Sequence, residues 1–201
     1  MKKFELTSEF NLNFFGRKFF RIKALVNIER YGVKAGDLGG WVEKEDNLSQ
    51  SGNAWVSGNA EVSGNACVSG DAVVSGNAKV SGNACVSGDA EVSGDAVVSG
   101  NAKVSGDAEV SGDAVVSGNA KVSGDADYAV IKGFGTVYRP TTFFRCHDGE
   151  VRVTCGCFYG TIDEFREQVK RTRKGKVADE YLKIADLMEY HFKKEDSGEN
   201  V

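Results

Sequence analysis

The stretch SGDAEVSGDAVVSGNAKV occupies residues 87–104, and an identical copy follows without interruption at residues 105–122. Both copies belong to a longer array, residues 51–128, in which the six-residue unit Ser-Gly-(Asn/Asp)-Ala-x-(Val/Tyr) occurs thirteen times. The 25 glycines of the chain therefore reflect a structural repeat and not a disordered low-complexity segment. Because a helix needs apolar residues spaced by three and four, the six-residue period favours strands and turns.

Within each unit the Ala, x and Val positions alternate, so Ala and Val are expected to face inward while x faces outward. Gly followed by Asn or Asp tolerates left-handed backbone and predicts a corner every six residues. Three corners close a triangular coil of eighteen residues, and successive coils stack as parallel sheets about 4.8 Å apart. The array predicts about four coils, and the duplicated stretch is one complete coil that lengthens the rod without disturbing its core.

The pattern Val-Ser-Gly-Asn-Ala-x resembles the hexapeptide repeat of left-handed parallel β-helix proteins, a superfamily that includes many acyltransferases and the γ-class carbonic anhydrases. More narrowly, the order of RIKAL, KAGDLGGWVEKEDNLSQSGNAWV, the repeats, VTCGCFYGTIDEF and EYLKIADLMEYHF resembles uncharacterised phage and prophage hexapeptide-repeat proteins. The resemblance implies a mainly-β fold with a left-handed triangular solenoid, and a viral or prophage origin.

We expect four segments: an N-terminal β cap (1–50), the solenoid (51–128), a C-terminal β cap (129–160) and a helical tail (161–201). TTFFRC and EVRVTC flank HDG, which predicts a hairpin that covers the open end of the solenoid. The spacing of Thr161 and Glu164 predicts a capping box at a helix start. The apolar stripes expected on the two helices are Ile162, Phe165 and Val169, then Tyr181, Ile184, Met188 and Phe192.

The composition excludes several classes of protein. A formal net charge of −4 argues against general affinity for nucleic acid or anionic membranes, and no apolar stretch reaches the ~18 residues of a membrane span. The start MKKFELTSEF lacks the apolar core of a signal peptide, so we expect a cytoplasmic protein of a bacterial host. In such a reducing compartment the five cysteines are expected as free thiols.

The enzymes of the superfamily provide no catalytic residues to carry over. Their acyltransferases use a histidine on a coil as general base, and the repeats here contain no histidine. A γ-class carbonic anhydrase needs three histidines around zinc, whereas this chain has only His147 and His191, both outside the repeats. We therefore expect a non-catalytic binding scaffold with no cofactor and no metal. The alternatives are a transferase with an interface site built from residues such as His147, Cys157 or Tyr159, and a structural phage component.

The outward positions form three columns, because a triangular solenoid places every eighteenth residue in line. One column contains Trp55, Val73, Glu91, Glu109 and Asp127, and its corners carry Asn53 followed by aspartates. Like charges about 4.8 Å apart repel by around 1 kcal/mol even in water, so a cationic partner would relieve the strain. The competing interpretation is that these acids only shape corners and keep the sheet soluble. The partner-binding residues expected on this face are Asp71, Asp89, Glu91, Asp107, Glu109, Asp125 and Asp127.

The partner is expected to be a host protein, for example a defence component, or a small-molecule ligand. Outward valines at positions 73, 97 and 115 predict burial against another subunit of a trimer or dimer, or against the tail of the same chain. The oligomer contacts expected on these grounds are Val73, Val97, Val115, Phe165 and Tyr181. Cys146, Cys155 and Cys157 lie close together in sequence and leave a metal site as an open question.

Overall fold

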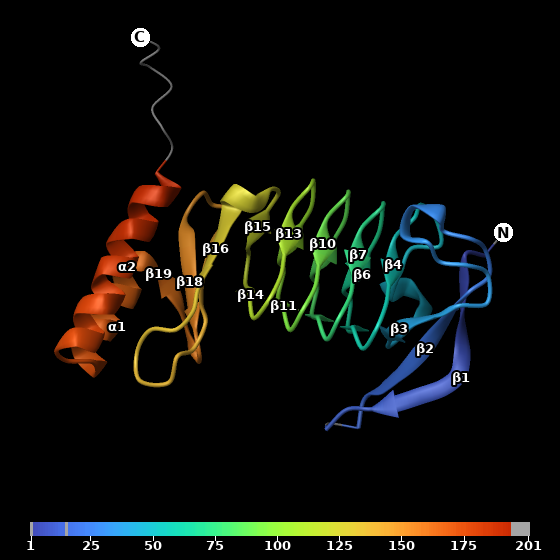
Figure 1. Cartoon of the computed structure of the whole chain (residues 1–201), viewed down its shortest axis with the longest axis horizontal. Coiled ribbons are helices and arrows are strands. Elements are labelled where there is room, and N and C mark those ends of the chain that lie inside the picture. The colour runs from blue at the N-terminus through green and yellow to red at the C-terminus, as the bar shows by residue number, and fades with distance from the viewer. Residues whose placement is uncertain (1, 15, 194–201) are drawn as a thin grey trace, which may run out of the picture.

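The computed structural model describes residues 2–14 and 16–193. The molecule is a rod, with a β-hairpin at the N-terminal end, a stack of coils in the middle, and a sheet with two helices at the C-terminal end (Figure 1). The first elements are β1 (Phe4–Leu12), β2 (Lys18–Ala24), a 3-10 turn (Glu29–Tyr31), β3 (Leu38–Val42) and a second 3-10 turn (Glu45–Asn47). The last eight residues of the predicted helical tail lie outside the described residues.

The x and Val positions of the first twelve repeats each form a strand of two residues, as the alternation predicts, whereas the thirteenth repeat forms a 3-10 turn, Asp125–Asp127. Every Ala and Val of the inward positions is buried from Ala54 to Val122, whereas the x positions after Trp55 are half-buried or exposed. The strands are β4 (Trp55–Val56), β5 (Glu61–Val62), β6 (Cys67–Val68), β7 (Val73–Val74), β8 (Lys79–Val80), β9 (Cys85–Val86), β10 (Glu91–Val92), β11 (Val97–Val98), β12 (Lys103–Val104), β13 (Glu109–Val110), β14 (Val115–Val116) and β15 (Lys121–Val122).

The strands stack into three parallel ladders, one on each side of the solenoid. Two sheets have four strands, in the orders β4-β7-β10-β13 and β6-β9-β12-β15, and the register pairs residues eighteen apart, such as Glu91 with Glu109. The third ladder, β5-β8-β11-β14, is extended by β3, which pairs in parallel with β5, and then by antiparallel β2 and β1. The predicted eighteen-residue coil is confirmed, and the cap merges into the solenoid through β3. The left-handed sense of winding stays a prediction.

The corners need glycine for two reasons. Gly94 has a φ of +68°, in the left-handed region that L side chains rarely adopt. A Cβ added to Gly94 would also lie 2.9 Å from the backbone nitrogen of Gly112 on the next coil. Close stacking of coils and the turn itself therefore both exclude a side chain, which explains why the glycines never vary in the array.

The hydrogen bonds that leave each corner run in one direction. Three N–H groups per unit donate to carbonyls of the following coil, as Trp55 does to Ala72 at 3.0 Å and Ser57 does to Val74 at 2.9 Å. The first coil therefore presents carbonyls that need donors, and the last coil presents N–H groups that need acceptors. The two ends of the solenoid thus require caps of opposite chemistry.

Donors from the N-terminal segment cover the carbonyls of the first coil. The Lys3 ammonium donates to Ala54 O at 2.7 Å and to Gly52 O at 3.3 Å. At another corner, the Asn47 side-chain amide donates to Ala66 O at 2.8 Å and to Gly64 O at 3.2 Å. Both side chains are buried, so they act as fixed parts of the cap and not as mobile surface groups.

Acceptors cover the N–H groups of the last coil. Thr142 Oγ1 accepts from Val115 N at 3.0 Å, and Asp125 Oδ1 accepts from Glu109 N at 3.0 Å. Thr142 lies on β17 (Thr141–Arg145), which forms an antiparallel hairpin with β18 (Val151–Cys155). The hairpin predicted to close the solenoid is confirmed, and it is part of a sheet completed by β16 (Tyr128–Ile131) and β19 (Phe158–Thr161).

The C-terminal sheet separates two cores. Phe144 packs into the core of the solenoid, whereas Phe143, the next residue of β17, packs against the helices on the other side. The helices are α1 (Ile162–Thr172) and α2 (Lys176–Phe192). The predicted capping box is confirmed, because Thr161 Oγ1 accepts from Glu164 N at 3.1 Å and Glu164 Oε2 accepts from Thr161 N at 2.8 Å.

Phe165 and Tyr181 differ from the expectation that they contact another subunit. They are only 3% and 7% exposed, and their rings meet edge to face with centroids 5.8 Å apart. Each lies on the apolar stripe of its helix, and both stripes are used to pack the helices on the sheet and on each other. The amphipathic pattern was correct, but the surface that it buries belongs to the same chain.

We expect deletion of residues 87–104 to leave a folded protein with cooperative thermal unfolding, because the identical copy restores every junction and every column. Deletion of residues 87–101 is the matched control. It shifts the following residues by half a repeat unit relative to the preceding coil, so that a corner lies against a strand. We expect it to abolish cooperative unfolding, monitored by circular dichroism. Equal melting behaviour of the two deletions would contradict the register described above.

The stability of the N-terminal cap should depend on pH through Lys3. Burial lowers the pKa of Lys3 from 10.5 to about 8, so between these values the unfolded chain binds a proton that the folded chain has released. The free energy of unfolding should therefore rise with pH between about pH 8 and 10, by up to about 1.4 kcal/mol per pH unit. Lys3→Met should remove this rise in urea titrations, and Lys2→Met at the exposed neighbour should retain it. Parallel pH profiles of both variants and the parent would contradict it.

Candidate functional site

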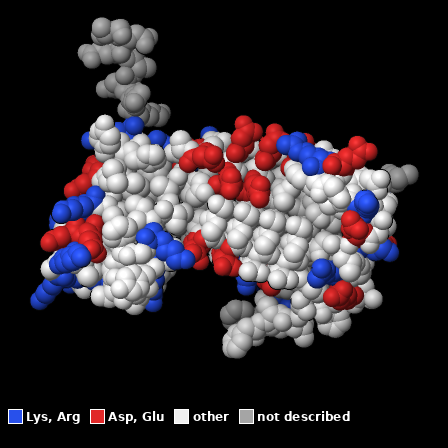
Figure 2. Space-filling model, viewed as in Figure 1, with Lys and Arg blue, Asp and Glu red and all other residues white. Residues whose placement is uncertain are grey.

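The seven carboxylates expected to bind a partner lie along one edge of the solenoid. Glu91 and Glu109 project from β10 and β13, and the aspartates occupy the corner that precedes this ladder and the 3-10 turn after the last coil. Figure 2 shows acidic side chains gathered along this edge, over β10 and β13. We call this surface the acidic face, and it consists of Asp71, Asp89, Glu91, Asp107, Glu109, Asp125 and Asp127.

The corner that carries the aspartates of the acidic face differs chemically from the corner that precedes the ladder β6-β9-β12-β15. There, amides form a continuous ladder, in which Asn83 donates to Asn101 at 3.0 Å and Asn101 donates to Asn119 at 3.1 Å. An amide both donates and accepts, so a column of asparagines satisfies itself. A carboxylate only accepts, so consecutive aspartates in the same position require donors from elsewhere.

The first two aspartates of the corner receive their donors from this chain. Asp71 Oδ1 accepts from the backbone and side-chain nitrogens of Asn53 at 3.1 and 3.0 Å, and these hydrogen bonds together with Arg30 lower the pKa of Asp71. The Arg30 guanidinium lies across two coils, with Nη1 at 2.8 Å from Asp71 Oδ2 and Nη2 at 2.6 Å from Asp89 Oδ1. Tyr31 fixes this segment by donating its hydroxyl proton to the Asp71 carbonyl.

Arg30 was missed by the sequence analysis. It belongs to the 3-10 turn Glu29–Tyr31 and lies 41 residues before Asp71, so the repeat period carries no information about its position. The only signal in the sequence is an arginine in a segment that must return to the first coils. The same segment covers Trp55, which is 3% exposed although the alternation places it outside.

The last two carboxylates serve to close the solenoid. Asp125 accepts from the backbone of Glu109, as described above, and Asp127 Oδ2 accepts from Ser123 N at 2.8 Å. Asp127 Oδ1 also lies 3.3 Å from Arg145 Nε of the hairpin. Glu91, Asp107 and Glu109 remain between the two ends, and they form no ion pair with any residue of the described chain.

The outward valines fall on two different faces. Val73 lies beside Trp55 and the 3-10 turn, in an open groove of about 520 Å³ that Tyr31 and Val33 also line. Val97 and Val115 pair in register on β11 and β14, and both are half-buried. Val115 lies next to the hairpin, because Thr142 and Thr154 bond its backbone N–H and carbonyl. A contact of these valines with another subunit stays a prediction.

The three C-terminal cysteines do not come together. Cys146 packs into the core of the solenoid, and burial raises the pKa of its thiol to about 11. Cys155 packs on the opposite side of the sheet, against the helices, and Cys157 is exposed in the turn before β19. Within residues 2–14 and 16–193, no group of three or more His, Cys, Asp or Glu side chains is placed to hold a metal ion.

The residues of the alternative transferase site are also separate. His147 is exposed in the turn between β17 and β18, and Tyr159 lies on β19, where its hydroxyl approaches Gly118. Burial is the main cause that raises the pKa of Tyr159. No hydrogen bond or ion pair joins His147, Cys157 and Tyr159 among the residues that the structure describes.

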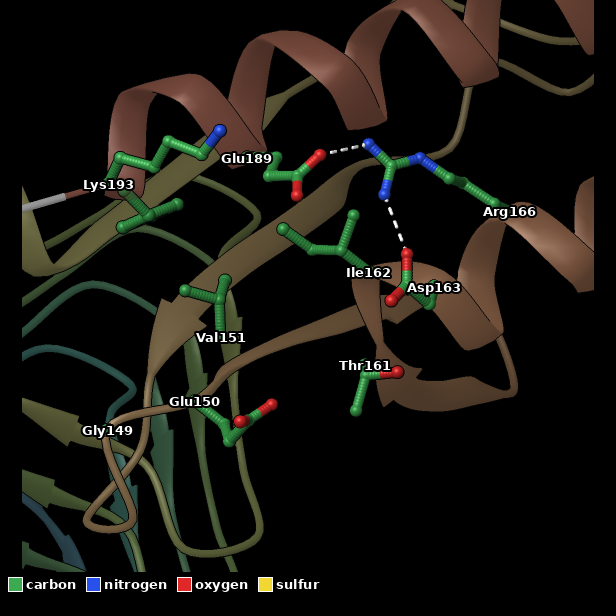
Figure 3. Close-up of a pocket in the computed structure, with 10 residues that line it drawn as sticks. Gly149, Glu150, Val151, Thr161, Ile162, Asp163, Arg166, Glu189 and Lys193 are labelled. Atoms are coloured by element: carbon green, nitrogen blue, oxygen red, sulfur yellow. Dashed lines mark hydrogen bonds and ion pairs between the residues drawn. The ribbon is translucent and has the colours of Figure 1, made fainter.

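A groove of about 260 Å³ lies between the hairpin and the two helices (Figure 3). Arg166 projects into it, but its guanidinium is engaged by Glu189 at 2.6 Å, Asp186 at 2.8 Å and Asp163 at 2.8 Å. The hydrogen bond to Glu189 is the largest influence on the pKa of Arg166, which is raised above its ordinary value. Because three carboxylates surround this cation, the groove is not suited to bind an anion. The ion pairs of Arg166 instead link α1 to α2.

Comparison with known proteins agrees with the architecture. A family model described as the YdcK beta solenoid repeat matches residues 60–76, which is one coil of the array. No curated protein matches the chain. The match and the parallel ladders define the chain as a β-solenoid protein. Among the described residues, neither helix is both long and apolar enough to span a lipid bilayer.

Replacing Arg30 should destabilise the protein, because the repulsion between the corner aspartates is then no longer compensated. We expect Arg30→Gln to lower the urea midpoint at low salt, and the loss should shrink as salt rises from about 0.01 M to 1 M and screens the aspartates. Arg17→Gln is the matched control, because the side chain of Arg17 is 46% exposed against 45% for Arg30 and, among the described residues, it forms an ion pair only with Glu43. If both variants responded to salt alike, the corner column would carry no special repulsion.

Proposed function

We propose that this chain is a non-catalytic binding scaffold whose acidic face binds an arginine-rich surface of a partner protein. The observation that carries the proposal is the position of Arg30 across Asp71 and Asp89. It demonstrates within this chain how one guanidinium spans two successive corners of the solenoid. The array repeats the same corner further along, where no residue of the described chain supplies a cation.

The geometry of the repeat favours arginine over lysine. Neighbouring coils are about 4.8 Å apart, and a guanidinium presents several N–H donors in one plane, so it bonds two carboxylates on adjacent coils at once. Lysine is a point charge and lacks this fork. Asp107 lies at the next corner after Asp89, and Glu91 and Glu109 lie beside it on the ladder. This cluster offers a partner's arginine the same arrangement that Arg30 finds.

Electrostatics support the same partner. Two like charges about 4 Å apart repel by about 1 kcal/mol in water, and the stacking register places Glu91 and Glu109 on directly paired backbone positions. A cationic partner removes this repulsion in the complex and gains the ion pairs as well. The affinity should therefore fall steeply as the ionic strength rises, and the association rate constant should be high.

The resemblance to phage and prophage hexapeptide-repeat proteins of the left-handed superfamily suggests the setting. On that basis we propose a cytoplasmic protein that binds and sequesters a host factor, such as a defence component, with exposed arginines. Assembly of the chain into a trimer or dimer would multiply the acidic face and strengthen such binding through avidity. The half-buried Val97 and Val115 are the residues that we propose for the subunit contact.

A labelled octa-arginine peptide provides a direct probe. The variant Glu91→Gln, Asp107→Asn, Glu109→Gln should bind it at least tenfold more weakly than the parent in fluorescence anisotropy, since three charges are removed while this corner accepts asparagine, as it does at Asn53. The fold can be checked by the melting temperature of each variant.

The matched control neutralises three carboxylates on another face of the solenoid, with the changes Glu61→Gln, Asp95→Asn and Asp113→Asn. It has the same net charge as the test variant, so it separates the acidic face from the overall charge. We expect the control to bind octa-arginine within about twofold of the parent. Equal losses of affinity in both variants would refute a specific role of the acidic face.

A further inference from the structure

Two thiols face each other on the ladder β6-β9-β12-β15, away from the acidic face. Cys67 and Cys85 are directly paired in the parallel register of β6 and β9, and their Sγ atoms lie 2.7 Å apart. Both side chains are half-buried and so remain in contact with solvent. The other three cysteines lie in the C-terminal sheet and are not adjacent to this pair.

The backbone spacing of the two coils falls within the range that disulfides span. Residues paired in neighbouring parallel strands have their Cα atoms about 4.8 Å apart, and disulfides span Cα distances of about 4.4 to 6.8 Å. On the same two coils, Asn65 donates to Asn83 at 3.2 Å and holds the corners before the two strands in register. The sulfur atoms therefore need only a small rotation of their side chains to reach bonding distance, and no coil has to move.

We propose that Cys67 and Cys85 are an oxidation site that forms a reversible inter-coil disulfide by exchange with a low-molecular-weight disulfide such as oxidised glutathione. The thiolate of Cys85 attacks one sulfur of oxidised glutathione, forms a mixed disulfide and releases one glutathione thiolate. Cys67 then loses its proton to water, attacks the Cys85 sulfur and releases the second glutathione. The two cysteines are oxidised by two electrons, and one oxidised glutathione is reduced to two thiols.

The same inter-coil disulfide forms whichever thiol attacks first. Burial, together with the neighbouring Cys85, raises the pKa of Cys67 to about 12, which lowers the fraction of thiolate at that sulfur. Cys85 has Lys103 as its register neighbour on the following strand, which places a positive charge on that side of the pair. The second step is intramolecular, and the close approach of the two sulfurs compensates for the low fraction of Cys67 thiolate.

The cross-link would join the coil of residues 51–68 to the coil of residues 69–86, which Arg30 in turn bridges to the coil of residues 87–104. Cys67 precedes Asp71 by four residues, and Cys85 precedes Asp89 by four. Oxidation therefore fastens the N-terminal part of the solenoid, where the cap joins the array. The bond closes a loop between residues 18 positions apart and so restricts the unfolded chain, which should raise the melting temperature by several degrees, on the order of 5 °C.

Trypsin distinguishes the possible products, because Lys79 lies between the two cysteines. Cleavage after Lys44, Lys79 and Lys103 places Cys67 in the peptide 45–79 and Cys85 in the peptide 80–103. After incubation of the folded chain with oxidised glutathione, we expect a disulfide-linked pair of these peptides in the monomer fraction of a non-reducing gel, and dithiothreitol should separate them. The result that would overturn the proposal is glutathione adducts alone, or links of either cysteine to Cys157 or to another molecule.

A thermal measurement provides the second readout. The parent chain should melt at a higher temperature after oxidation than after reduction, and Cys85→Ser should show no difference between the two treatments. Cys157→Ser is the control, since it removes the exposed thiol and should keep the full rise. If oxidation left the melting temperature of the parent unchanged, or raised that of Cys85→Ser equally, the inter-coil bond would be refuted.

Discussion

Successive coils of this solenoid stack in a strict eighteen-residue register, because every corner donates hydrogen bonds to the coil that follows it. The rest of the structure depends on this constraint. It brings the backbones of neighbouring corners so close that only glycine fits, and it buries one Ala and one Val from each unit along the axis. It also gives the rod two chemically different ends. A buried ammonium and an amide supply donors at the first coil, and hydroxyl and carboxylate oxygens supply acceptors at the last.

Because of the same register, a residue that recurs every eighteen positions forms a column of identical side chains. An asparagine column satisfies its own hydrogen bonds, whereas the carboxylates of an aspartate column cannot donate to one another and need other donors. Arg30 provides donors to the aspartates at one end of the column. At the other end, Asp127 accepts a hydrogen bond from Ser123 and closes the C-terminal turn. Between them the charge of Glu91, Asp107 and Glu109 is not compensated within the described chain. The function that we propose follows from this residual charge, and the thiol pair on another face follows from the same pairing rule.

The repeat was sufficient to predict the parallel ladders, the three columns and the inward alanines and valines, because these features depend only on the six-residue period. The hairpin and the capping box were predicted from local signals that contain their own geometry. Long-range contacts were not predictable in this way. Nothing in the sequence near Arg30 indicates that it returns to Asp71 and Asp89, and the burial of Trp55 depends on the same return. Phe165 and Tyr181 were correctly identified as apolar stripe residues, but the stripe alone cannot distinguish packing within the chain from packing between chains.

A crystal structure of the chain with a bound arginine-rich peptide tests the central claim most directly. We predict that Arg30 lies across Asp71 and Asp89, and that a peptide guanidinium bonds to Asp107 together with a carboxylate of the adjacent ladder or corner. The asparagine corner on the other side of the solenoid should remain without peptide. A peptide bound elsewhere, or an Arg30 side chain that points away from both aspartates, would contradict the account.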